Sequence, residues 1–217
     1  ETLTLDLDRF DIAIANGLIG KDLGIKGAGT GAVRLTSPLH EKGILADLIC
    51  DSTYFAGEPL GIMHLGSIWN EKDRNFGILL RNELDGRNGI DAYGTFTPEG
   101  RVIEASADLD RFNIGYAQPV LDEIFSEMGG YISGKIDVSG PLSKMEISSE
   151  ETRLEDGMLK VAYTNVPYHI EGPFHVDETG AYFDEMTLRD NYSGRGTVRG
   201  SINWDHFRDI AFDTRIK

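Results

Sequence analysis

Two closely spaced pairs of aspartates are the residues of this chain that could most directly perform chemistry. Asp6 and Asp8 belong to the pentapeptide DLDRF, and the same pentapeptide recurs with Asp108 and Asp110. Two carboxylates on one face of a strand could bind a divalent cation or act as the acid and base of a glycoside hydrolase. Neither pair is followed by further oxygen ligands at the spacing of a calcium-binding loop, so a solvated outer face is the favoured interpretation.

Other residue types that support chemistry occur without a recognisable site. The run 27–31 (GAGTG) has no helix signal behind it and no Gly-Lys-Ser, so we expect a glycine-kinked strand rather than a phosphate loop. Cys50 is the only cysteine, which excludes an internal disulfide and a cysteine-based zinc site. No residue has a recognisable nucleophile context, so we expect no enzyme, no cofactor and no metal site. The histidines are not spaced as metal ligands are, and we expect them at the surface. They are His40, His64, His169, His175 and His206.

Charge and composition narrow the class of partner. The 217 residues include 36 acidic and 21 basic side chains, which gives a net charge of −15 at pH 7. Such a surface repels phosphate backbones and anionic membranes, so we expect no nucleic acid partner. The apolar runs are far shorter than the roughly 20 residues that span a bilayer, and no signal segment opens the chain. Because a strand-like pattern begins at once, we expect an excerpt from a longer protein.

Alternation of apolar and polar residues predicts that the chain is almost entirely β. The clearest alternation covers residues 168–176, and shorter alternating runs cover 33–36, 132–138 and 159–164. A period of two over such lengths is typical of strands with one apolar and one solvated face. Turn signals such as Asp156-Gly157 separate the runs at short spacing.

Two segments are predicted to be helical. Residues 119–128 place four apolar side chains on one helical face, ahead of Gly129 and Gly130, which we expect to end the helix. Residues 17–23 occupy the equivalent place after the first DLDRF and could form a shorter helical turn.

The recurring pentapeptide marks a structural repeat of about 100 residues. Each copy is followed by an isoleucine (Ile12 or Ile114), a helical insertion, a glycine-punctuated strand and a Pro-Leu turn. Each copy later contains a Leu-Arg pair and a short glycine-rich strand. We place the repeats at approximately 1–103 and 104–210, within one continuous domain over residues 1–217.

The alternation shifts by one residue at the same point of both copies. In the first copy the apolar residues up to Leu7 share one parity, whereas those from Phe10 onward take the other. A shift of one residue exchanges the two faces of a strand, so we predict a bulge near Arg9 and near Arg111.

Three segments resemble a known family. They are VSGPLSKMEI (138–147), DGMLKVAYTNVPYHI (156–170) and LRDNYSGRGTVRGSINW (188–204). In order, spacing and duplication they resemble the C-terminal, TamB-like (translocation and assembly module) domain of the AsmA-like superfamily. In that family a Gly-x-Pro turn precedes a series of short strands, and a Gly-x-Val-x-Gly strand closes each unit. The resemblance covers nearly the whole chain and is strongest over 130–204.

The resemblance implies a fold and a location. The implied fold is all-β: an elongated antiparallel sheet, folded along its length into a β-taco-like half-pipe, repetitive, with an apolar concave groove and one or two short helices. A closed sandwich core is the alternative explanation for the alternating strands. Members of the family are anchored in the inner membrane of Gram-negative bacteria and extend through the periplasm, so the resemblance implies a periplasmic location.

Two functions stay open on this resemblance. One is a hydrophobic groove that carries phospholipid between the inner and outer membranes and supports outer-membrane biogenesis. Its partners would be phospholipid acyl chains and, through the full-length protein, an outer-membrane barrel of the TamA type. The other is a periplasmic scaffold or chaperone that assists the assembly of outer-membrane proteins (autotransporters) by strand augmentation. The candidate residues of the groove are Ile132, Ile136, Val161, Tyr163, Tyr168, Ile170, Phe174, Val176, Val198 and Ile202.

Overall fold

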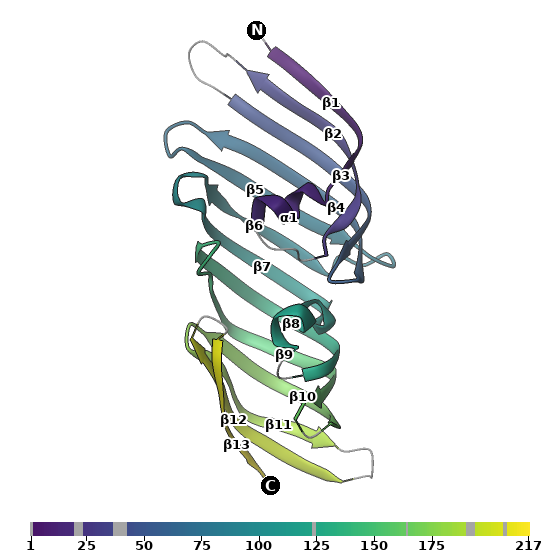
Figure 1. Cartoon of the computed structure of the whole chain (residues 1–217), viewed down its shortest axis with the longest axis vertical. Helices are drawn as coiled ribbons and strands as arrows, with labels where there is room; N and C mark the ends of the chain where they lie inside the picture. Colours follow the sequence, from purple (N-terminus) through teal and green to yellow (C-terminus); the bar gives the residue numbers. More distant parts are fainter. Residues whose placement is uncertain are drawn as a thin grey trace. The chain divides into compact units, whose positions relative to one another are not determined.

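The described part of the chain is built almost entirely from strands (Figure 1). The computed structural model describes residues 2–19, 24–36, 43–122, 125–163, 165–189, 194–205 and 208–217. The hydrogen-bonded order of the strands follows the order of the sequence from β1 to β13. Pairing is antiparallel from β1 to β6 and from β9 to β13. The prediction of an all-β chain with a repetitive antiparallel sheet is therefore confirmed.

The chain divides into two compact units, which we describe separately. Unit 1 comprises Glu1–Ala107 and Ser139–Ser143, and unit 2 comprises Asp108–Val138 and Lys144–Lys217. The strands of unit 1 are β1 (Thr2–Asp11), β2 (Lys26–Thr36), β3 (Gly43–Phe55), β4 (Glu58–Asn70), β5 (Asn75–Glu83) and β6 (Ile90–Thr97). The strands β7 (Val102–Asn113) and β8 (Phe125–Pro141) contribute residues to both units. Unit 2 continues with β9 (Glu146–Val161), β10 (Val166–Asp177), β11 (Gly180–Arg189), β12 (Arg195–Asp205) and β13 (Arg208–Ile216).

The helical segments are shorter than the sequence predicts. In unit 2 a 3-10 segment, η2 (Ile114–Ala117), leads into α2 (Gln118–Leu121), and β8 has begun by Phe125. The helix predicted over 119–128 is therefore wrong for its second half. An isolated helix of about ten residues is marginal in water, whereas β8 gains a partner strand, as the 2.6 Å ion pair between Glu127 and Lys160 of β9 shows.

The equivalent helix of unit 1 is displaced from its predicted position. The segment α1 runs over Ile14–Ile19, so it begins before the predicted start at Gly17. The last residues of that prediction, 20–23, lie outside the described residues. A second 3-10 segment, η1 (Glu99–Arg101), precedes β7.

The two DLDRF segments share one bulged backbone. Arg9 and Arg111 both have a left-handed φ of 49°, and the pairing of β1 with β2 shifts register between Leu7 and Phe10. The N–H of Arg9 donates to the Oγ1 of Thr30 at 3.4 Å, and the N–H of Arg111 donates to the Oγ of Ser133 at 3.1 Å. The bulge predicted from the shifted alternation is confirmed at Arg9, and Arg111 has the same backbone and a matching hydroxyl partner.

The residue after each pentapeptide turns the chain out of its strand. The carboxylate of Asp11 accepts a hydrogen bond from the N–H of Ala13 at 2.9 Å. At the corresponding place Asn113 accepts one from the N–H of Gly115 at 2.8 Å. Such short side-chain-to-backbone bonds replace the lost ladder bond and direct the chain into a turn.

A side-chain amide then ties each helical segment to the strand that follows it. Asn16 exchanges two hydrogen bonds with the backbone of Ile25, at 3.1 and 3.3 Å. Gln118 donates to the carbonyl of Phe125 at 2.7 Å. Both units therefore hold the helical segment in place by the same chemistry, with an asparagine in one and a glutamine in the other.

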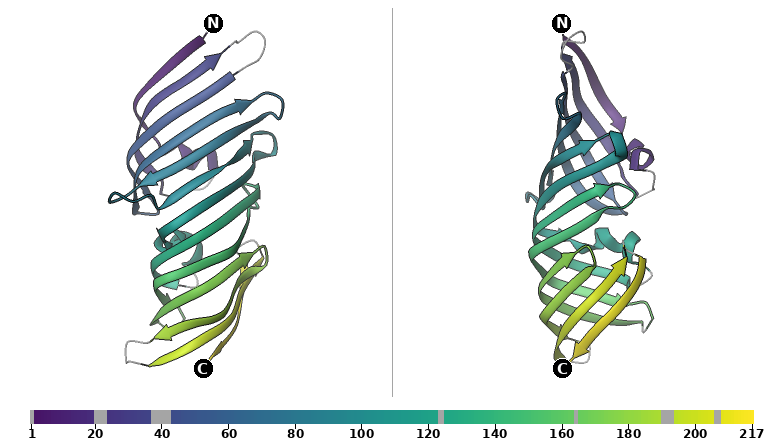
Figure 2. Two further views of the ribbon diagram at one scale, coloured as in Figure 1. Left: turned by 180° about the vertical axis from the view of Figure 1, so that it is seen from behind. Right: turned by 90° about the vertical axis from the view of Figure 1, so that its left-hand side faces the viewer.

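An isoleucine anchors each helical segment over one face of its sheet. In unit 1, Ile12 is 8% exposed and packs with Cys50 of β3 and Met63 of β4. In unit 2, Ile114 is 4% exposed and packs with the strands from β9 to β12. Figure 2 shows α1 lying to one side of the strands of its unit. Each unit thus has an apolar face with a short helical segment packed against it.

Two adjacent glycines of β8 differ sharply in the space around them. Gly130 has a φ of 107°, and a Cβ there would lie 2.7 Å from the carbonyl oxygen of Asp156 and from the Cα of Gly157 on β9. A Cβ on Gly129 would meet only the flexible end of Met158, at 3.8 Å. Only Gly130 is therefore required for the close approach of β8 and β9.

We predict that Gly130→Ala lowers the free energy of unfolding by about 1–3 kcal/mol, because the new methyl group strains the backbone and collides with β9. Gly129→Ala is the matched control and should leave stability unchanged or raise it by up to about 1 kcal/mol. Urea unfolding of both variants measures the difference. Equal stability of the two variants would contradict the close approach at Gly130.

Candidate apolar binding face

The apolar face of unit 2 is centred on five buried side chains. They are Ile114, Leu154, Met186, Leu188 and Val198. Partly buried apolar side chains pack around them: Met128, Ile132, Leu159, Tyr168, Ile170, Phe174 and Phe183. We call these residues together the apolar face of unit 2. They come from β8, β9, β10, β11 and β12, with Ile114 added from the helical segment.

Strand register places these side chains on one side of the sheet. Ile170 of β10 pairs with Gly157 of β9 and with Leu188 of β11. Met186 of β11 pairs with Val198 of β12. Directly paired residues of an antiparallel sheet point to the same face, so apolar side chains of β10, β11 and β12 share one side of the sheet.

The protein covers this face only in part. Among the described residues, no large side chain is less than 2% exposed. Tyr168, Ile170 and Phe174 pack against the buried five but keep an intermediate exposure. A core between two packed layers would bury such residues completely. The apolar face therefore has the composition of a core and the exposure of a surface.

Half of the groove candidates lie in this cluster, namely Ile132, Tyr168, Ile170, Phe174 and Val198. Four others lie outside the cluster but on the same side of the sheet by strand alternation and register. They are Ile136, Val161, Val176 and Ile202. Val176, for example, pairs with Ala181, which pairs in turn with Ile202.

Tyr163 is the candidate that the structure keeps apart from the others. The strand predicted through Tyr163 ends at Val161, and the tyrosine is 96% exposed in the following turn. Asn165 takes a left-handed φ of 55°, and its N–H donates to the carbonyl of Val161 at 2.8 Å. A turn of this type is closed by a residue of positive φ, a conformation that asparagine tolerates well.

Sequence reasoning missed Leu154, Met186 and Leu188 because bulges break the period of two. Leu154 and Leu159 have opposite parity but share the face, since Asp156 between them takes a left-handed φ of 49°. The β11–β12 pairing shifts register between Phe183 and Met186 in the same way. A bulge inserts one residue into the alternation, so a strict two-residue template rejects these positions.

The buried hydroxyls of unit 2 are committed to the backbone of one bulge. Ser149 and Thr152 lie 3.0 Å apart through their hydroxyl oxygens. Thr152 donates to the carbonyl of Phe174 at 2.6 Å, and Ser149 accepts from the N–H of Val176 at 3.0 Å. Because these groups are satisfied within the sheet, they stabilise the register of β9 against β10.

Unit 1 presents a smaller apolar cluster of the same kind. Its buried residues are Ile12, Cys50 and Met63. The partly buried apolar side chains packed against them are Phe10, Ile25, Leu60 and Leu80. Burial, with a smaller contribution from the Asp51 carboxylate, raises the pKa of the Cys50 thiol. The thiol is therefore protonated at neutral pH and behaves as a small apolar side chain.

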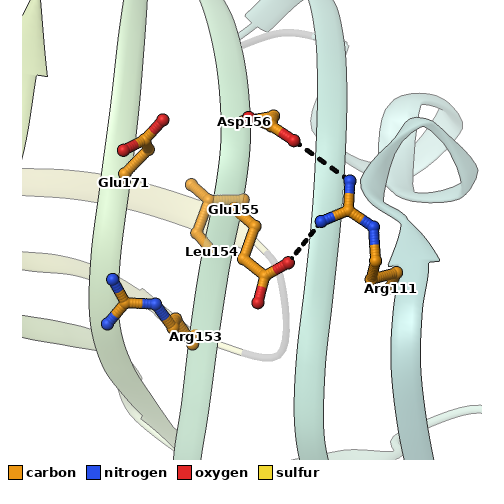
Figure 3. Close-up of a pocket in the computed structure, with 6 residues that line it drawn as sticks. All are labelled: Arg111, Arg153, Leu154, Glu155, Asp156 and Glu171. Atoms are coloured by element: carbon orange, nitrogen blue, oxygen red, sulfur yellow. Dashed lines mark hydrogen bonds and ion pairs between the residues drawn. The ribbon is translucent and has the colours of Figure 1, made fainter.

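The opposite side of unit 2 carries an ion-pair network centred on Arg111 (Figure 3). Its guanidinium lies 2.6 Å from Glu155 and 3.0 Å from Asp156, and 4.3 Å above the ring of Tyr131. The hydrogen bond that Arg111 donates to Asp156, together with the charges of both carboxylates, raises the pKa of Arg111. Since the Arg111 bulge starts on β7 and the carboxylates lie on β9, the network ties strands on either side of β8.

A shallow polar depression of about 240 Å³ adjoins this network. Arg153 and Glu171 complete its lining, with Leu154 as the single apolar side chain. Two arginines and three carboxylates line it, so opposite charges largely neutralise one another and only a small negative excess remains.

The aspartates that first suggested chemistry are all exposed. Asp6, Asp8, Asp108 and Asp110 lie on the solvated side of their strands, as the outer-face interpretation predicts. Within the described residues no group of histidine, cysteine and acidic side chains could hold a metal ion. The glycine run 27–31 lies inside β2, so its interpretation as a kinked strand is confirmed.

The histidines that are described lie at the surface. His64, His169 and His175 are exposed, and His175 stacks on Tyr182 with the ring centroids 5.1 Å apart. The predictions for His40 and His206 lie outside the described residues.

Comparison with known proteins leaves the chain without an assigned relative. No family model, curated protein or solved structure matches it. The resemblance to TamB-like domains therefore stays a prediction. In the described residues no helix combines the length and the hydrophobicity needed to cross a membrane.

We predict that replacing Asp108 and Asp110 together by asparagine changes the free energy of unfolding by no more than about 0.5 kcal/mol per site, because both carboxylates are exposed. Thermal unfolding measures this effect, and calorimetric titration with calcium and manganese tests the metal-binding alternative. Tight binding by the wild-type chain that disappears in the double variant would show that the aspartates form a metal site.

Proposed function

We propose that the apolar face of each unit binds the acyl chains of phospholipids. The observation that carries the proposal is the intermediate exposure of Tyr168, Ile170 and Phe174, which pack against a buried cluster without being covered by it. An apolar surface of this kind calls for an apolar ligand, because exposed clusters of large side chains in monomeric proteins mark binding surfaces. Acyl chains match it because they bring no polar group that would need a partner within the face.

The energetics suit a ligand that must move. Each methylene group transferred from water to an apolar environment gains about 0.8 kcal/mol. A few covered methylenes therefore hold a chain against water while allowing it to slide along a row of similar side chains. The hydroxyls of Ser149 and Thr152 are already hydrogen-bonded within the sheet, so they need no polar partner from the acyl chain.

The biological role follows from the resemblance to TamB-like domains. We propose that the chain is part of a periplasmic protein that conducts phospholipid between the inner and outer membranes of a Gram-negative bacterium and supports outer-membrane biogenesis. The full-length protein would be anchored in the inner membrane and would meet an outer-membrane barrel partner of the TamA type. No catalytic step is needed for such a role, so we propose a carrier rather than an enzyme.

We favour lipid binding through the apolar face over the second function, in which the chain is a scaffold that acts by strand augmentation. Strand augmentation uses the free backbone groups at the edge of a sheet, whereas the feature that both units share is a partly covered apolar face. Lipid retained on the purified chain supports the first function. Saturable binding of an extended outer-membrane strand peptide, without any retained lipid, would support the second.

We predict that Ile170→Asp abolishes lipid retention while the strand content is kept. Ile170 lies in the middle of the apolar face, between Gly157 and Leu188, and is not fully buried. The free protein tolerates a carboxylate at this position because water can still solvate it. An acyl chain bound over the carboxylate would remove that water, so binding becomes unfavourable. Mass spectrometry of lipid extracted after gentle purification measures retention, and circular dichroism measures strand content.

His169→Asp is the matched control, because His169 is the adjacent residue of β10 and is exposed on the opposite side. It introduces the same carboxylate and should keep both lipid and fold. Val198→Asp should behave differently from Ile170→Asp, since Val198 is only 7% exposed and a charge there destabilises the sheet. Loss of the β signal in Ile170→Asp itself would identify a packed core and contradict the proposal.

A further inference from the structure

Unit 1 carries a second apolar patch, on the side of the sheet opposite its buried cluster. Its members are large side chains that are between 38% and 59% exposed. They are Leu45, Ile49, Ile62, Ile68, Leu79 and Tyr93. We call these six residues the outer patch. The proposed lipid-binding role does not use it, because it faces away from Ile12, Cys50 and Met63.

Strand register establishes the side on which the outer patch lies. Met63 of β4 pairs with Cys50 of β3, and both belong to the buried cluster. The residues next to Met63, including Ile62, therefore point the other way. The pairing of β4 with β5 is continuous from Ile62 to Asn70, without a bulge. Side-chain direction is thus fixed throughout the patch.

The centre of the outer patch alternates large side chains with glycines. Leu79 of β5 pairs with Gly66 of β4, and Ile68 of β4 pairs with Gly77 of β5. Leu79 is 59% exposed and Ile68 is 57% exposed. The local twofold axis of the antiparallel pair exchanges the two glycines with each other and the two large residues with each other. The two strands therefore form a symmetric pattern of projections and depressions.

We propose that the outer patch binds a second copy of this chain. A twofold axis that runs along the strands between β4 and β5 places β4 of one copy over β5 of the other. Leu79 then stands opposite Gly66 of the second copy, and Ile68 stands opposite Gly77. An isologous interface needs a self-complementary surface, and this alternation provides one without any change of backbone.

The same axis also brings complementary polar groups together. It places β6 of one copy over β3 of the other, so Tyr93 lies opposite Asp47, which pairs with Gly66 in the register of its own chain. The phenol of Tyr93 can donate a hydrogen bond to the exposed carboxylate of Asp47. Symmetry supplies this pair twice. The two residues are three strands apart within one chain, about 14 Å at the usual strand spacing, and cannot meet there.

The size of the patch fits a reversible dimer. Six side chains that are roughly half exposed offer about 400–500 Å² of apolar surface, which is the size of the largest apolar patch on a typical monomer, and such patches are often functional. A stable interface buries about 800 Å² on each partner, including its polar rim. The outer patch supplies the apolar centre of such an interface, and we expect a dissociation constant on the order of 10 µM.

Sedimentation velocity of the 217-residue chain over a range of concentrations tests the proposal. The wild-type chain should pass from monomer to dimer as its concentration rises. Leu79→Lys should weaken the dimer at least tenfold and leave the circular dichroism spectrum unchanged, because Leu79 is largely exposed in the monomer. Tyr163→Lys is the control: it makes the same change of charge at a fully exposed apolar residue outside the patch and should dimerise like the wild type.

A double-mutant cycle tests the orientation of the two copies. Asp47→Ala and Tyr93→Phe should each weaken the dimer several-fold, and the combined variant should be no weaker than the weaker of the two. Such coupling between residues that are too far apart to interact in one chain reports contact between copies. A chain that stays monomeric at all concentrations, a dimer that Leu79→Lys leaves intact, or strictly additive effects would each overturn the proposal.

Discussion

The apolar face of a single β-sheet must be removed from water, and within the described residues each unit has one short helical segment packed against that face. A sheet is normally covered by a second sheet or by a layer of helices. Here α1 in unit 1 and the segment η2–α2 in unit 2 reach part of the face, anchored by Ile12 and Ile114. The remaining apolar side chains stay partly exposed, and this exposure is the basis of the proposal that the face binds an apolar ligand.

Local bulges decide which side chains reach that face. Arg9, Arg111 and Asp156 all take a left-handed backbone, and each shifts the alternation of its strand by one residue. The shift at Asp156 allows Leu154 and Leu159 to share a face, and the hydroxyls of Ser149 and Thr152 stabilise a second irregularity nearby. The side of the sheet that a residue faces therefore depends on the bulges as much as on the two-residue alternation.

The part of the fold that depends on local chemistry could be predicted from the sequence. Alternation along 168–176 predicted β10, and the slipped alternation around DLDRF predicted the bulge at Arg9. The helix expected over 119–128 failed because four apolar residues at helical spacing do not outweigh pairing with a neighbouring strand. That competition is tertiary, and no local pattern reports it.

The residues of the candidate site likewise fall into those that the local pattern predicts and those that it does not. Ile170 and Phe174 lie on an uninterrupted alternating strand, so their place on the apolar face followed from the pattern. Leu154 and Met186 lie beside bulges and were missed, and Tyr163 was included because nothing in its own residue type signals that β9 ends at Val161. The outer patch of unit 1 was also missed, because the sequence of a strand does not show whether another element packs over its outer side.

A photo-crosslinking experiment tests the central claim most directly, with a zwitterionic phospholipid that carries a diazirine in its acyl chain and with peptide mapping of the labelled residues. The account predicts label on Tyr168, Ile170 and Phe174 and none on His169 or His175 of the same strand. Equal labelling of both sides of β10, or label confined to the outer side, would contradict it.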